Sequence, residues 1–144
     1  MTTVLIAADT TEASLEAARV AHTLFGDTAE YLVVNVGQPE NDNREWGASY
    51  PLIMPLALPG DDPEALQRAE AVAADVAESA DLPSAEPIGD TGDPATAIIR
   101  AAHQHDVDVI VVGSHKHSWF SRLFSGSVTS DVVRDADIPV LVVK

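Results

Sequence analysis

The part of the sequence with the clearest chemical potential runs from Gly113 to Ser127. Between residues 109 and 130 the chain has no carboxylate, although the whole chain has 23 Asp and Glu against 8 Lys and Arg. The cationic and imidazole side chains of this stretch are His115, Lys116, His117 and Arg122. An acid-free segment in so acidic a chain is a local zone that tolerates anions. The pattern therefore favours an anionic ligand over a cationic one.

Gly126 and Ser127 stand directly before a predicted helix that starts near Val128. The first turn of a helix offers free N–H groups and the positive end of the helix dipole, which together favour a phosphate. The hydroxyls of Ser127 and Thr129 would add donors. The alternative is that Ser127 only caps its own helix, as serine commonly does.

Two further sets of side chains are candidates for chemistry. Asp9 ends the apolar run Val4–Ala8, which is typical of a buried strand, so its carboxylate would face the crevice where parallel sheets bind ligands. The alternative is that Asp9 only starts the helix that follows. His115 and His117 could bind a metal only with a third ligand from elsewhere, and we interpret them as solvated loop histidines.

These candidates must be positioned by alternating strands and helices. Apolar runs predict five strands, over Val4–Ala8, Tyr31–Val36, Ala85–Ile88, Val107–Val112 and Pro139–Val143. Helical spacing and capping residues predict helices from Thr10 or Thr11 to Gly26, from Asp62-Pro63 to Ala80, from Asp93-Pro94 to about His103, and from Ser127 to Ala136. The alternation predicts one α/β domain over residues 1–144, with a parallel sheet, right-handed crossovers and helices on both faces.

One long connection interrupts this alternation, from Gly37 to Asp62. It holds Pro39, Pro51, Pro55 and Pro59 and shows little periodicity. The apolar part, Tyr50–Leu58, could form a lid or an interface, and the alternative is a loop that covers the edge of the sheet.

Composition excludes several classes of function. A net charge of −15 repels nucleic acid backbones and anionic lipid heads, so we expect neither partner. The absence of cysteine excludes disulfides and thiol chemistry. No basic, long apolar leader or membrane span is evident, which predicts a cytoplasmic protein. The chain has no Gly-x-Ser-x-Gly elbow and no Gly-x4-Gly-Lys-(Ser/Thr) loop, which argues against conventional hydrolase, kinase or ATPase chemistry.

The segment Gly113-x2-Lys116-x9-Gly126-Ser127 resembles the nucleotide-binding signature of the universal stress protein family, Gly-x2-Gly-x9-Gly-(Ser/Thr). Ala7-Ala8-Asp9 also matches the family's first strand, which ends on an acid, and Gly92-Asp93-Pro94-Ala95 resembles its turn before the third helix. The similarity covers the chain apart from about residues 38–60.

The resemblance implies a Rossmann-like, three-layer fold with an open five-stranded parallel sheet of order 3-2-1-4-5. It also implies a homodimer formed through the last strand, and ATP or AMP as ligand in some members, with Mg as a possible companion. Asp9, beside Ala7, and the backbone of Val36 would then hold the adenosine. The ribose and phosphates would be held by Gly113, Gly126, Ser127, Val128 and Thr129.

The sequence departs from the signature at Lys116, which replaces the second glycine. A lysine there could supply charge to a phosphate from its side chain. The bulky segment of residues 117–123 resembles instead the branch of the family that does not bind ATP. Two functions are therefore carried forward: a nucleotide-binding stress-response protein that acts through its dimer, and a dimeric interaction protein with a blocked site. Slow ATP hydrolysis is a weaker third, since Asp9 and His115 are the only candidate bases.

Overall fold

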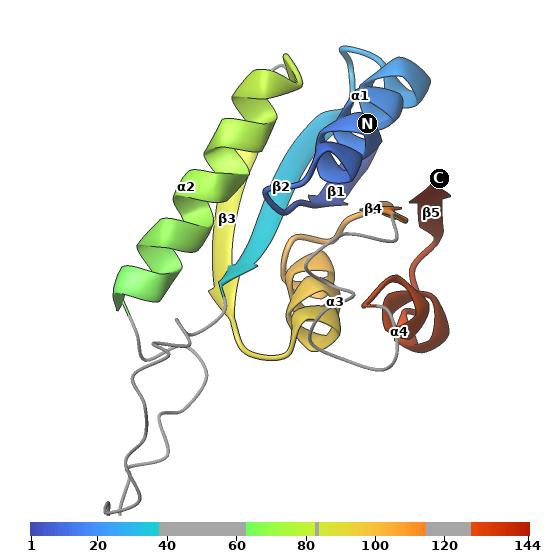
Figure 1. Ribbon diagram of the computed structural model, residues 1–144. Helices are drawn as coiled ribbons and strands as arrows, with labels where there is room; N and C mark the ends of the chain where they lie inside the picture. The colour runs from blue at the N-terminus through green and yellow to red at the C-terminus, as the bar shows by residue number, and fades with distance from the viewer. Residues whose placement is uncertain (38–62, 83, 115–127) are drawn as a thin grey trace, which may run out of the picture.

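The computed structural model describes residues 1–37, 63–82, 84–114 and 128–144. Strands and helices alternate along these residues, with helices on both sides of one sheet (Figure 1). The strands are β1 (Thr3–Ala7), β2 (Glu30–Gly37), β3 (Glu86–Thr91), β4 (Val109–Gly113) and β5 (Val140–Val143). The helices are α1 (Glu12–Phe25), α2 (Pro63–Ser79), α3 (Pro94–Gln104) and α4 (Val128–Asp135).

All strand pairs are parallel, and the order across the sheet is β3-β2-β1-β4-β5. Ile6 of β1 lies between Val33 of β2 and Val111 of β4, so β1 is the central strand. The chain proceeds outward from β1 to β3 and then crosses back to β4. The strand order therefore reverses between β1 and β4, and ligands of such sheets bind beyond the carboxyl ends of the strands at that reversal. The predicted fold class and strand order are confirmed.

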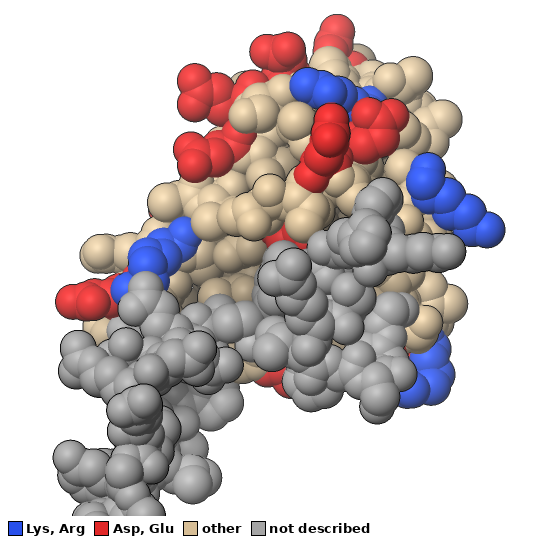
Figure 2. Space-filling view, in the orientation of Figure 1, with Lys and Arg blue, Asp and Glu red and all other residues tan. Residues whose placement is uncertain are grey.

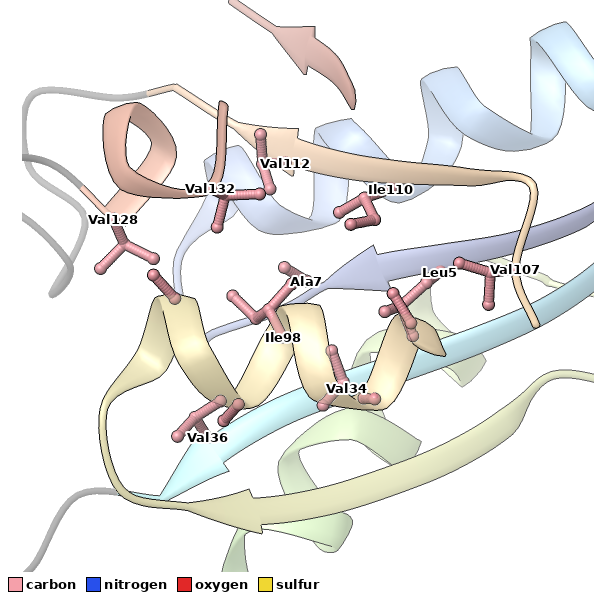
Figure 3. Close-up of a cluster of buried hydrophobic side chains, with 14 of the residues drawn as sticks. Leu5, Ala7, Val34, Val36, Ile98, Val107, Ile110, Val112, Val128 and Val132 are labelled. Atoms are coloured by element: carbon pink, nitrogen blue, oxygen red, sulfur yellow. The ribbon is translucent and has the colours of Figure 1, made fainter. Parts of the chain in front are cut away.

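Each face of the sheet is covered by a different pair of helices. Leu5 and Ala7 of β1 point toward α3 and α4, where Ile98 and Val132 cover them (Figure 3). Val4 and Ile6 point the other way, into a cluster made with α1 and α2. Because successive side chains of a strand alternate between faces, burial on both faces requires an unbroken apolar run. That requirement explains why apolar runs in the sequence predicted the strands β1 and β4.

Small residues let the helices lie close to the sheet. Ala69 and Ala73 are buried on α2, and a Cβ added to Gly89 of β3 would lie 2.7 Å from the backbone N of Glu70 and closer still to the Leu66 carbonyl oxygen. The strand continues beyond this glycine to Thr91, so the predicted range Ala85–Ile88 ended too early. Gly89 weakens the strand pattern in the sequence, yet it is the residue that allows α2 to pack against β3.

The structure confirms the predicted end of α1 at Gly26 and the predicted cap of α3 at Asp93. Gly26 follows α1 with a φ of +72°, a conformation that favours glycine, and Asp93 caps α3 by accepting a 3.0 Å bond from the Thr96 N–H. The expectation that β4 begins at Val107 was wrong. The Val107 N–H is still bonded to the Ala102 carbonyl at the end of α3, so the strand starts only at Val109. The predicted caps Asp62 and Ser127 lie outside the described residues.

Within the described ranges, no helix has the length and apolar character needed to cross a membrane.

Replacing Gly89 with alanine is expected to destabilise the fold by about 1–3 kcal/mol, because the added methyl group meets the backbone of α2. The sign is informative, since alanine in a strand without this contact would stabilise by about 0.5–1 kcal/mol relative to glycine. Chemical denaturation followed by circular dichroism measures the difference. Glu86→Ala, at an exposed position of the same strand, is the control. An unchanged midpoint for Gly89→Ala would contradict the packing argument.

Candidate functional site

Asp9 follows the carboxyl end of β1 and is 1% exposed. Its Oδ1 atom accepts a 2.8 Å hydrogen bond from the Thr11 N–H and a second, short bond from the Thr11 hydroxyl. The prediction of Thr11 as a possible N-cap of α1 is confirmed in position. Thr11 occupies the N-cap position, but its hydroxyl turns back to Asp9 and makes no cap bond. One oxygen of the Asp9 carboxylate thus organises the turn between β1 and α1.

Two buried side chains that the sequence reasoning missed hold the peptide group just before this carboxylate. The Asn35 Nδ2 atom donates to the Ala8 carbonyl oxygen at 2.8 Å, and the Ser14 Oγ atom accepts from the Asp9 N–H at 2.8 Å. Asn35 is 7% exposed and Ser14 is 4% exposed. A single polar residue inside the apolar run of β2 was a signal that could have identified Asn35.

Hollows of ligand size lie on both sides of the β1–α1 turn. One has a volume of about 450 Å³ and lies between α1 and α2, with Asp9, Leu15 and Asp75 in its lining. The other has a volume of about 480 Å³ and lies between the start of α1 and the ends of β4 and β5, where Ser114 and Lys144 line it. Small-molecule sites are commonly about 300–1,000 Å³, so either hollow has room for a nucleotide fragment.

The end of β4 and the start of α4 are joined directly. The Thr129 hydroxyl donates to the Gly113 carbonyl oxygen at 3.1 Å, so its proton is engaged within the protein. A Cβ at Gly113 would lie 2.9 Å from the Ala13 carbonyl oxygen, which means that the first glycine of the signature allows α1 to pack against β4. Val128 buries its side chain in the core (Figure 3), so only its main chain could meet a ligand.

Ala7 and Val36 also bury their side chains (Figure 3). The main chain of Val36 is placed differently. The Ala8 N–H donates to the Val34 carbonyl at 2.8 Å, so Val34 directs its polar groups toward β1. Peptide groups alternate sides along a strand, and Val36 is two residues further on. Its carbonyl therefore points to the β1 side of β2, beyond the last residue of β1.

The structure thus brings Asp9, Gly113 and Thr129 to the carboxyl edge of the central strands, with the Val36 carbonyl at the neighbouring strand. Lys116, Gly126 and Ser127 lie outside the described residues, as do His115 and His117. In the part of the chain that the structure describes, no three His, Asp or Glu side chains are grouped to hold a metal ion.

Acidic side chains lie beside one of these hollows. Figure 2 shows acidic side chains gathered over the upper part of the molecule, where Figure 1 draws α1 and the end of α2. Glu12 and Glu16 line the second hollow together with Lys144. A phosphate-bearing ligand would need a local excess of cations or N–H donors to offset this field.

The chain resembles several known proteins in sequence or in fold. The chain is 43% identical over 53 residues to the stress response protein NhaX of Bacillus subtilis, a match covering 37% of this chain and 32% of NhaX. The chain therefore spans about a third of that relative. A universal stress protein crystallised with cAMP superposes with a TM-score of 0.66 at 22% identity, over 99% of this chain and 96% of the other. An Arabidopsis thaliana family protein with AMP bound gives a TM-score of 0.56 at 17% identity, over 100% and 92% of the two chains.

These solved structures share the fold of this chain. The sequence profile of the universal stress protein family matches residues 1–144. Because that match extends from the first residue to the last, the protein belongs to the universal stress protein family.

Proposed function

We propose that this protein binds an adenine nucleotide at the carboxyl ends of β1, β2 and β4 and acts in a stress response by binding rather than by catalysis. The observation that carries the proposal is the buried Asp9 carboxylate at the point where the strand order reverses. The fold relatives crystallised with cAMP and with AMP support the ligand class.

The adenosine end of the ligand would lie against Asp9 and Val36. A carboxylate accepts hydrogen bonds from ribose hydroxyls, and both Thr11 bonds go to Oδ1, so Oδ2 is the atom we assign to the ligand. The Val36 carbonyl, pointing past the end of β1, would accept from the adenine amino group. Ala7 would contribute through its main chain.

The phosphate end would lie near the start of α4. Gly126, Ser127 and the main chain of Val128 would supply N–H donors, and Lys116 would supply charge. Thr129 would contribute by holding α4 against the end of β4 through the Gly113 carbonyl. Mg could accompany ATP at this end. AMP and ATP are both assigned as ligands, because the adenosine contacts are common to them.

The acting form would be a cytoplasmic homodimer. β5 lies at the edge of the sheet and pairs only with β4 among the described strands. Its residues Val140–Val143 are aliphatic and half-buried. An edge strand of this kind offers unpaired backbone groups to a second copy.

A second candidate function has one observation in its favour, the lysine at position 116 where the family signature has glycine. A side chain at a position that approaches a phosphate closely would block it. The chain would then be a dimeric interaction protein with an empty site.

The nucleotide is tested first by binding. Isothermal titration with AMP and with Mg-ATP, together with analysis of nucleotide released from the denatured protein, is expected to show a specific site. Ligand at about 100 times Kd should stabilise the fold by about 2.7 kcal/mol. Asp9→Asn keeps an oxygen acceptor for Thr11 but removes the charge, and hydrogen bonds to charged groups contribute about 1.5–3 kcal/mol, so AMP affinity should fall at least about tenfold.

Asp108→Asn is the matched control, since the Asp108 carboxylate accepts from the Thr3 N–H at the opposite end of β1 from Asp9. Gly126→Val should abolish binding while the protein stays folded. No released nucleotide and no thermal shift at millimolar AMP or ATP would reject this proposal and leave the interaction protein.

The role of the Val36 carbonyl is tested by changing the ligand instead of the chain. Inosine monophosphate carries a carbonyl where AMP carries its amino group, so two acceptors would face each other. AMP should therefore bind at least about fivefold tighter, because an unpaired buried polar group costs about 1–3 kcal/mol. Competition titration gives the ratio. Equal affinities would show that the base does not meet this carbonyl.

A further inference from the structure

A single peptide group, the one between Ala8 and Asp9, is held at both of its polar ends by buried side chains. Its carbonyl oxygen accepts from Asn35 Nδ2 at 2.8 Å, and its N–H donates to Ser14 Oγ at 2.8 Å. Asn35 comes from β2 and Ser14 from the first turn of α1, so the two contacts reach the peptide from different elements. This peptide lies where β1 leaves the sheet.

The chemistry of the two side chains is unusual for their surroundings. Tyr31, Val33 and Asn35 alternate along β2 toward the face covered by α1 and α2, where the residues are otherwise mainly aliphatic and alanine. An aliphatic residue at position 35 would bury apolar surface, whereas an amide must find a partner or lose its hydration. Among the described residues, the buried polar or charged side chains are those of Asp9, Ser14 and Asn35. All three lie at this peptide.

We infer that Asn35 and Ser14 are positioning residues, which fix the Ala8–Asp9 peptide and thereby aim the Asp9 carboxylate at the ligand. The plane of that peptide sets the backbone angles on either side of it, and these set the direction of the Cα–Cβ bond of Asp9. Thr11 then fixes one carboxylate oxygen. The inference rests on the proposed nucleotide site for its functional consequence.

Because the carboxylate is already ordered, ligand binding costs less conformational entropy. A buried acid that could rotate among several directions would lose conformational freedom when a ligand binds, and affinity would fall accordingly. A peptide held from both sides removes that freedom beforehand. The hydrogen bonds of Asn35 and Ser14 should therefore influence affinity without either side chain touching the nucleotide.

Asn35→Leu and Ser14→Ala are the test variants, and AMP affinity and thermal stability are the paired measurements. Asn35→Leu should weaken AMP binding about tenfold. It should also lower the melting temperature, because the buried Ala8 carbonyl oxygen loses its hydrogen-bond partner. Ser14→Ala should act in the same direction. A variant that loses stability but binds AMP with unchanged affinity would mean that the side chain is only structural, and would overturn the inference.

Tyr31→Phe is the matched control. Tyr31 lies on the same strand and the same face as Asn35, and its hydroxyl donates to the Gly26 carbonyl at 2.7 Å, at the opposite end of β2. Burial and the nearby Asp27 carboxylate raise the pKa of Tyr31, so the hydroxyl stays a neutral donor at physiological pH. Removing it should lower stability and leave AMP affinity unchanged.

A double-mutant cycle separates positioning from direct contact. If Asn35 acts through Asp9, the tenfold effect of Asn35→Leu should largely vanish in the Asp9→Asn background. Equal effects of Asn35→Leu in both backgrounds would show that it does not act through this carboxylate.

A readout without nucleotide keeps the inference independent of the proposed function. Amide hydrogen exchange at Asp9, followed by nuclear magnetic resonance, should be at least about tenfold faster in Ser14→Ala and Asn35→Leu than in the wild type and in Tyr31→Phe. If the wild type binds no nucleotide, the proposed function fails. The exchange rates then still show whether Asn35 and Ser14 fix the Ala8–Asp9 peptide. Unchanged exchange at Asp9 in both variants would overturn the inference.

Discussion

The burial of β1 on both faces is the constraint on which the rest of this structure depends. Val4 and Ile6 lie under α1 and α2, while Leu5 and Ala7 lie under α3 and α4, so the central strand has no exposed side. A strand so enclosed satisfies its backbone through its neighbours, and here both neighbours run parallel to it, with helices covering the two faces. The close approach of the helices then requires alanines on α1 and α2 and glycine at positions such as Gly89 and Gly113.

The same constraint produces the site. Where β1 ends, its ladder ends, and the next polar groups would be buried without partners. Asn35 donates to the Ala8 carbonyl in place of a neighbouring strand, and Ser14 accepts from the Asp9 N–H. Thr11 donates to one carboxylate oxygen of Asp9. The chain thus holds the Asp9 carboxylate in one direction at the strand reversal. Without these bonds the side chain could adopt several directions. The solution to a folding problem and the orientation of a candidate ligand group are here the same set of hydrogen bonds.

Charge sets a second condition on function. The net charge of −15 opposes the approach of an anionic ligand, and Figure 2 shows acidic side chains over α1 and the end of α2. The segment between residues 109 and 130 has no carboxylate that would add to this repulsion. An anionic ligand of this protein would therefore be selected by local donors and cations, and the overall surface would keep nucleic acids and anionic membranes away.

Much of the fold was determined by the sequence alone. The apolar runs, the Asp93-Pro94 start of α3 and the Gly26 end of α1 depend on local conformational preferences and on periodicity, which neighbouring residues carry by themselves. The strand order came from the resemblance to the family and not from these patterns, and the acid at Asp9 was recognised for its place at the end of a strand. Gly89, by contrast, interrupts the strand pattern of β3 in the sequence. A glycine stands there because a Cβ would meet the backbone of α2.

Only the tertiary structure decided how the site is held together. Asn35 meets Ala8 across 27 residues of sequence, and Thr129 meets Gly113 across 16. Such bonds exist because the register of the parallel strands and the packing of α1 and α4 bring distant residues to one edge of the sheet. No local pattern encodes that register, since it is the outcome of burying the described strands and helices together.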